Sequence, residues 1–191
     1  MKGKELAHSL NIQMSKEIAN KLGGEQKKLS KEFSEKRFYD SSPHLAIATK
    51  FMGEEKTDEF IEALKNEFRN DTAWELEFSD FRISDTIDYI FLHLNTDSEQ
   101  KLINLHNRVL KATKNIGLEV QTGNKFRHFS YIPHISIIKL SPEEADKALN
   151  VIRKDFSEIK MRIDCFEITR QTDDEKGFSN FPIIDKINLL R

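Results

Sequence analysis

The sequence predicts an α+β protein: a two-lobed, pseudo-symmetric repeat of β-α-β-β units around a central groove, preceded by an N-terminal helical extension. Three observations predict this class. The order strand, helix, strand, strand occurs twice along the chain, and both copies open on the dipeptide Pro-His. The 191 residues are enough for one domain with a sizeable core. The 14 phenylalanines indicate that this core is rich in aromatic side chains.

The first copy begins at His44. Its short apolar run is typical of a buried strand, and the helix after it carries Phe60, Leu64 and Phe68 on one face. The two segments that follow alternate between apolar and polar residues, which favours a pair of strands. The expected elements are a strand over 44–51, a helix over 57–70, strands over 74–83 and 86–94, and a long helix over 97–116.

The second copy begins at His134 and contains the clearest helix start of the chain. Ser141 can cap this helix, Pro142 suits its first turn and Glu144 completes a capping box. The expected elements are strands over 134–140, 158–170 and 181–190 and a helix over 141–156.

The N-terminal segment has a different pattern. Apolar residues recur every four residues over 6–22, which predicts a helix, and Gly23-Gly24 is a stop signal. We therefore expect an N-terminal helical extension over 1–40 and a single bilobal domain over 41–191.

The composition is that of a soluble globular protein, with 38% hydrophobic and 32% charged residues. The single cysteine, Cys165, excludes an internal disulfide and a cysteine-based zinc cluster, and it fits a reducing compartment. No apolar run approaches the ~18 residues of a membrane-spanning helix. The basic N-terminus lacks the apolar region of a signal peptide. We expect a cytoplasmic monomer that does not bind membranes.

The charge is unevenly distributed. The formal net charge is −2, yet residues 41–99 carry −9 and residues 100–142 carry +6. Such a basic stretch can attract an anionic ligand, or it can be a solvated helix face. Charge alone favours the second interpretation.

The two Pro-His strands carry the most informative pattern. Pro43-His44 and Pro133-His134 stand 90 residues apart, each at the start of a strand. Residues i and i+2 of a strand share a face, so His44 is grouped with Ala46 and His134 with Ser136. If a pseudo-two-fold axis relates the copies, the two imidazoles meet in the groove.

Two opposed imidazoles suit phosphodiester cleavage. That reaction needs a base to take the proton of the nucleophile and an acid to protonate the leaving oxygen, and histidine serves either role near neutral pH. The Ser136 hydroxyl can donate to a non-bridging phosphate oxygen. No metal is required. The other histidines lack the spacing of a zinc site, and we interpret His106 as a boundary residue of its helix.

These paired motifs, His-hydrophobic-Ser/Thr-hydrophobic after a proline, resemble the 2H phosphoesterase superfamily. That group includes the bacterial 2'-5' RNA ligases and 2',3'-cyclic phosphodiesterases. The resemblance implies two catalytic histidines, His44 and His134, and a phosphate-binding hydroxyl in each motif. Ser136 matches the second motif. The first motif departs from the pattern, because Ala46 stands where the family has serine or threonine.

The alanine leaves three possibilities open. Another donor replaces the hydroxyl, Lys50 being the same-face candidate; or the substrate binds asymmetrically; or the site only binds its ligand. The basic and aromatic segment before the second motif adds two candidate substrate contacts. Tyr131 can stack on a base and Arg127 can pair with a phosphate. The alternative is an ordinary loop that leads into a strand.

The leading hypothesis is a metal-independent phosphodiesterase, without a cofactor, that acts on RNA ends or small, including cyclic, nucleotides. In it, His44 and His134 form the general acid–base pair and Ser136 holds the phosphate. One alternative is a catalytically degenerate nucleotide- or RNA-binding module of the same fold. Others are 2'-5' RNA ligation by the reverse reaction, and an interaction protein whose first 40 residues recruit a partner.

Overall fold

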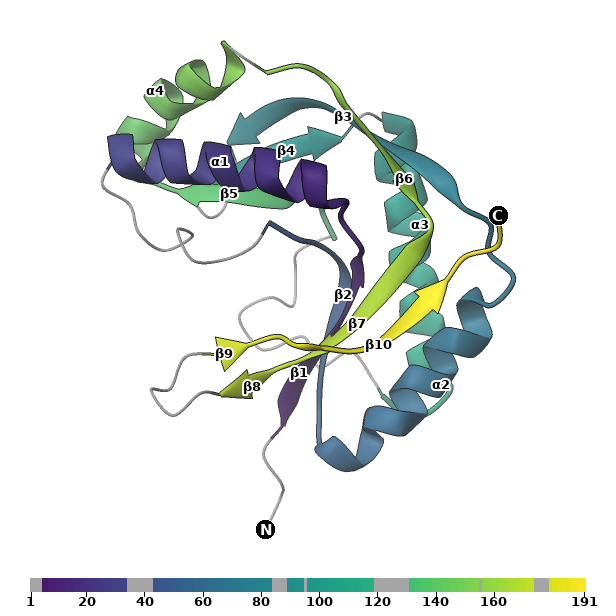
Figure 1. Cartoon of the computed structure of the whole chain (residues 1–191). Coiled ribbons are helices and arrows are strands. Elements are labelled where there is room, and N and C mark those ends of the chain that lie inside the picture. The colour runs from purple at the N-terminus through teal and green to yellow at the C-terminus, as the bar shows by residue number, and fades with distance from the viewer. Residues whose placement is uncertain are drawn as a thin grey trace.

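The computed structural model describes most of the chain and contains two four-stranded antiparallel sheets (Figure 1). The described residues are 5–33, 43–83, 89–94, 96–118, 131–154, 156–173 and 179–191. With helices packed on both sheets, the α+β class is confirmed.

The first sheet has the strand order β10-β7-β1-β2. Its strands are β1 (Leu6–Ile12), β2 (Leu45–Met52), β7 (Cys165–Arg170) and β10 (Ile183–Asn188). The second sheet has the order β5-β4-β3-β6. Its strands are β3 (Trp74–Ile83), β4 (Tyr89–Leu94), β5 (Ile135–Lys139) and β6 (Ile159–Ile163). A small hairpin joins β8 (Thr172–Asp173) to β9 (Ser179–Asn180). The two Pro-His motifs therefore precede the edge strands β2 and β5.

Helices cover one face of each sheet. They are α1 (Lys16–Glu32), α2 (Thr57–Phe68, after a 3₁₀ turn over Glu54–Lys56), α3 (Thr96–Lys114) and α4 (Pro142–Arg153). α2 and α3 pack on the first sheet, and α1 and α4 on the second. Figure 1 shows α1 and α4 together beside β5, and α2 on the other side of the molecule near β10.

The core is rich in aromatic side chains, as predicted. Among the residues that the structure describes, five phenylalanines are fully buried: Phe60, Phe68, Phe78, Phe81 and Phe166. The rings of Phe68 in α2 and Phe166 in β7 meet edge to face at 5.3 Å, a favourable geometry for aromatic pairs. This contact fixes α2 against the first sheet.

The prediction of a helix over 6–22 is correct for residues 16–22 but wrong for residues 6–12. Residues 6–12 form β1, which lies between β2 and β7 in the first sheet, and α1 starts at Lys16 after the N-cap Ser15. Gly23 and Gly24 lie inside α1 and do not end it. Residues 6–12 thus belong to the same sheet as β2, although the prediction placed them in an extension over 1–40 and β2 in the domain over 41–191.

The expectation that each sequence copy forms one lobe is also wrong. The first copy places β2 in the first sheet but β3 and β4 in the second. The second copy places β5 and β6 in the second sheet but β7 in the first. The single long strand expected over 158–170 is therefore two strands, because the chain leaves one sheet and enters the other at the exposed Asp164.

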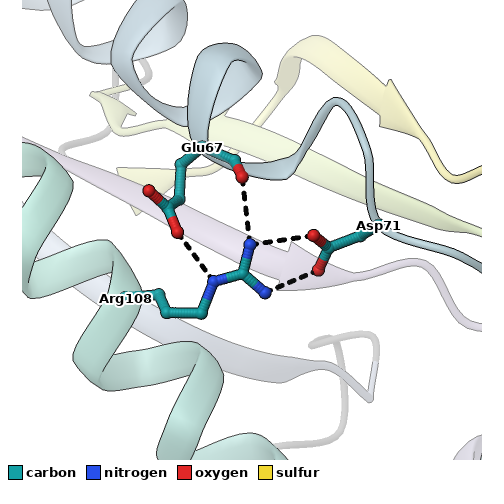
Figure 2. Close-up of polar contacts among 3 residues, drawn as sticks. All are labelled: Glu67, Asp71 and Arg108. Atoms are coloured by element: carbon teal, nitrogen blue, oxygen red, sulfur yellow. Dashed lines mark hydrogen bonds and ion pairs between the residues drawn. The ribbon is translucent and has the colours of Figure 1, made fainter.

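One ionic cluster joins the two helices of the first sheet. Figure 2 shows the Arg108 guanidinium of α3 between Glu67 of α2 and Asp71. It donates two hydrogen bonds to the Asp71 carboxylate at 2.7 and 2.8 Å and one to the Glu67 carboxylate at 2.7 Å. Such bidentate pairs hold their partners in a defined geometry. Arg108, one of the cations of the basic stretch, thus has a structural partner.

Among the described residues, no helix is both long enough and apolar enough to cross a membrane.

Candidate active site

The two catalytic candidates stand at the starts of edge strands in different sheets. His44 is exposed just before β2, and His134 is half-buried just before β5. The Nδ1 of His134 lies 2.7 Å from the Ile132 carbonyl oxygen. Because a carbonyl only accepts, Nδ1 carries the proton and the neutral ring keeps its lone pair on Nε2. That lone pair is what a general base needs.

Both motif strands contain a β-bulge at the same position. Against β1, Leu10 pairs with Ala48 and Asn11 with Ala46, so Ile47 is the extra residue. Against β4, Ile90 pairs with Ile138 and Phe91 with Ser136, so Ile137 is the extra residue. A bulge places two residues opposite one and re-aims the side chains that follow. The pseudo-symmetry of the motifs therefore extends to this irregularity.

The bulge overturns the expectation that Lys50 shares a face with Ala46. Beyond Ile47 the alternation reverses: Ala48, Lys50 and Met52 are buried, whereas Thr49 is exposed. Lys50 is 4% exposed, and within the part of the chain that the structure describes its Nζ has no hydrogen-bond partner. Burial lowers the pKa of this amine. The prediction of Lys50 as the same-face replacement for the missing hydroxyl is wrong, because its side chain lies on the helix-covered side of β2.

Tyr131, a predicted substrate contact, is bonded to the first motif. Its hydroxyl donates to the Ala46 carbonyl oxygen at 2.8 Å. Its ring stacks on His106 of α3 at 4.2 Å between centroids, with 8° between the planes. The Nδ1 of His106 in turn lies 2.8 Å from the carbonyl oxygen of Ile47. Two side chains thus bind consecutive carbonyls at the bulge of β2.

This arrangement shifts the titration of both rings. Burial raises the pKa of the Tyr131 hydroxyl. Burial also lowers the pKa of His106, as does the nearby charge of Lys50, while the hydrogen bond to Ile47 acts in the opposite direction. Sequence reasoning interpreted His106 as a helix boundary residue, and its spacing carries no signal of this contact, since the carbonyl it binds is 59 positions away.

The remaining predicted residues have separate surroundings. The side chain of Ser136 is partly exposed, and its backbone carbonyl accepts a hydrogen bond from the Gln26 amide of α1 at 3.2 Å. Arg127 lies outside the described residues. Within the described part of the chain, no group of three or more His, Cys, Asp or Glu residues could hold a metal ion.

An α+β protein with two motif strands of this kind has the fold of a 2H-type phosphoesterase. The sequence profile of the 2'-5' RNA ligase superfamily matches residues 16–175. The chain therefore belongs to the 2'-5' RNA ligase superfamily, which confirms the resemblance to 2H phosphoesterases. No curated protein matches the chain by sequence.

Solved structures share the fold at low sequence identity. The E. coli LigT structure in its apo form matches with a TM-score of 0.71 and 13% identity, covering 99% of this chain and 100% of that one. The E. coli LigT structure complexed with 3'-AMP matches with a TM-score of 0.67 and 11% identity, over 99% and 100%. The TT0787 protein of Thermus thermophilus matches with a TM-score of 0.67 and 11% identity, over 96% and 97%.

Proposed function

We propose that this protein is a metal-independent phosphodiesterase that acts on RNA ends or small, including cyclic, nucleotides. His44 and His134 form the general acid–base pair, and Ser136 holds the phosphate. The substrate class is supported by family membership and by the fold shared with LigT, which has been solved with 3'-AMP.

The mechanism for a 2',3'-cyclic phosphate needs one base and one acid. One imidazole takes a proton from water as the water oxygen bonds to phosphorus. The other imidazole gives its proton to the ribose oxygen as the bond between that oxygen and phosphorus breaks. Each role contributes roughly 10²–10⁴ in rate. The Ser136 hydroxyl donates to a non-bridging oxygen, where negative charge develops. The pseudo-symmetry of the motifs leaves the assignment of the two roles to experiment.

The observation that carries the proposal is the hydrogen bond from Tyr131 to the Ala46 carbonyl. Tyr131 precedes His134 by three residues, and Ala46 follows His44 by two. The bond therefore ties the segment that leads into β5 to the other motif strand, β2, which supports a site formed between the two motifs.

The departure at Ala46 favours a second candidate function, a nucleotide- or RNA-binding module that has lost turnover. An alanine cannot donate to a phosphate, so the first motif lacks one of the family's two hydroxyls. The reverse of the cleavage reaction, 2'-5' ligation, uses the same groups and remains an alternative direction of the proposed chemistry.

The test is a substrate panel of 2',3'-cyclic nucleotides, linear 2'-5' dinucleotides and cyclic dinucleotides, assayed in excess chelator. We expect turnover by the wild-type protein. Turnover should fall at least 10²-fold in His44→Ala and in His134→Ala. Lys147→Ala, which changes an exposed residue of α4, is the control and should match the wild type.

The outcomes separate the candidates. A protein that binds a panel member but shows no turnover is the binding module. Activity that is lost with chelator and restored by a divalent ion contradicts the metal-independent mechanism. Full activity in either histidine variant contradicts the acid–base pair.

A further inference from the structure

Asn11 of β1 lies directly opposite Ala46 of β2 in the strand register. Residues opposite each other on antiparallel strands point to the same face, with Cβ atoms about 4.5–5.5 Å apart. The flanking residues Leu10 and Ile12 are buried in the core beneath the helices. Asn11 therefore shares with Ala46 the face turned away from α2 and α3. We call this the far face of the first sheet. Its residues include Ser9, Asn11, Ala46, Thr49, Glu167, Thr169 and Lys186.

We propose that Asn11 supplies the hydrogen-bond donor to the substrate phosphate that Ala46 lacks. This inference rests on the proposed function and deepens it, because it assigns the first half of the phosphate site to a neighbouring strand. The Asn11 amide takes the place of the family's first-motif hydroxyl, and the small Ala46 side chain leaves it room.

The Asn11 amide is held in a defined orientation. Its Nδ2 donates to the Thr169 hydroxyl of β7 at 3.0 Å. Asn11 is 9% exposed and Thr169 is 7% exposed, so this bond lies largely out of water. A primary amide has two N–H donors. One is used by Thr169, and the other is the donor that we assign to the phosphate.

The second motif has the complementary arrangement. Ser136 carries its hydroxyl on the motif strand, and its register partner on β4 is the apolar residue Phe91. In the first half, the motif strand carries the apolar Ala46, and its register partner on β1 is the polar Asn11. Each register pair thus contains one hydrogen-bond donor. In the second half it is on the motif strand, and in the first half it is on the neighbouring strand.

The charges around Asn11 allow an anion to approach. Its register partner on the other side is Glu167 of β7. Lys186 of β10 pairs with that carboxylate at 3.0 Å, which offsets its charge. Farther along the far face, the hydroxyls of Ser9 and Thr49 lie 2.7 Å apart. The groups around Asn11 on this face are therefore neutral hydroxyls and one carboxylate that is paired with a lysine.

The experiment is a rescue of Asn11→Ala by Ala46→Ser. We measure kcat/KM on the best substrate of the panel, and the affinity for a nucleoside 3'-monophosphate by calorimetry. Loss of one preorganised donor costs about 10²-fold in kcat. Asn11→Ala should lose about that much and bind the monophosphate more weakly. The Asn11→Ala/Ala46→Ser double variant, which returns the hydroxyl to the motif strand, should recover most of both.

Two further variants keep the test specific. Asn11→Asp has nearly the same shape but replaces the donor by a negative oxygen, so it should lose at least as much activity as Asn11→Ala. Lys147→Ala changes an exposed residue of α4, away from this sheet, and it should keep activity within about twofold. Wild-type activity and affinity in Asn11→Ala overturn the inference. A loss of activity in Asn11→Ala that Ala46→Ser does not recover also overturns it.

The two proposals fail in different ways. If the wild type turns over the panel and His134→Ala does not, but Asn11→Ala is fully active, only the inference about Asn11 fails. If the wild type binds the monophosphate through Asn11 but turns over nothing, the phosphodiesterase proposal fails and the donor assignment stands. If the wild type neither binds nor cleaves, both are overturned.

Discussion

The Tyr131 hydroxyl donates a hydrogen bond of 2.8 Å to the Ala46 carbonyl oxygen across 85 positions of sequence. The acceptor lies next to the β-bulge of β2. The same tyrosine stacks on His106 of α3, and His106 bonds the next carbonyl of β2. Both α3 and the segment that leads into β5 therefore contact one short stretch of β2. These contacts connect the segment before His134 to the strand that follows His44.

The first prediction concerns this bond. Tyr131→Phe keeps the stacked ring but removes the hydroxyl, and a bond of this kind contributes about 0.5–1.5 kcal/mol to stability. Since small displacements of reacting groups reduce rates steeply, we expect kcat to fall about 10-fold with little change in KM. Steady-state kinetics on a 2',3'-cyclic nucleotide and urea unfolding check both values. A rise in KM at constant kcat would instead identify Tyr131 as a substrate contact.

The second prediction concerns the buried Lys50. Its amine is shielded from water and has no hydrogen-bond partner among the described residues, an arrangement that costs free energy. Lys50→Met keeps the aliphatic volume and removes the amine, so the free energy of unfolding should rise by about 1–3 kcal/mol. Activity should stay within about twofold of the wild type. Urea unfolding and the panel assay measure the two effects, and a large loss of activity would contradict the placement of Lys50 away from the substrate.

The third prediction concerns His8, whose side chain is fully buried in β1. Its Nε2 lies 3.0 Å from the Thr57 hydroxyl, and its Nδ1 lies 3.0 Å from the Leu6 carbonyl oxygen. Burial lowers the pKa of this imidazole, although the bond to Leu6 opposes the shift. The unfolded chain therefore binds a proton at a higher pH than the folded chain does.

The sign of the pH effect follows from that difference. The unfolded state binds more protons below its ordinary histidine pKa of about 6.5, so stability is complete above that pH and is lost as the pH falls below it. His106, whose pKa is also lowered, acts in the same direction. We expect the urea midpoint of unfolding to decrease as the pH is lowered from about 7.5 to about 5.5. The decrease should be smaller in His8→Asn. An equal decrease in both proteins would contradict the contribution of His8.

Local sequence patterns were sufficient for the elements that have one buried face. The periodic apolar residues of α2 predict its position to within two residues, and the alternation of β3 predicts Trp74–Ile83 without error. The strand β1 could not be predicted in this way. It is an inner strand paired on both edges, and its polar residues bond partners far along the chain, as His8 bonds Thr57 and Asn11 bonds Thr169. Its pattern therefore lacks alternation.

The sequence alone predicts the proposed catalytic residues His44, His134 and Ser136, because residues i and i+2 of a strand share a face. The bulges at Ile47 and Ile137 decide which later residues of each strand share a face with the motif residues. These bulges arise from pairing with β1 and β4. The pairing of Asn11 with Ala46 and the exchange of strands between sheets were likewise decided by tertiary structure. Hydrogen bonding between segments far apart in the chain leaves no local pattern from which such pairings can be predicted.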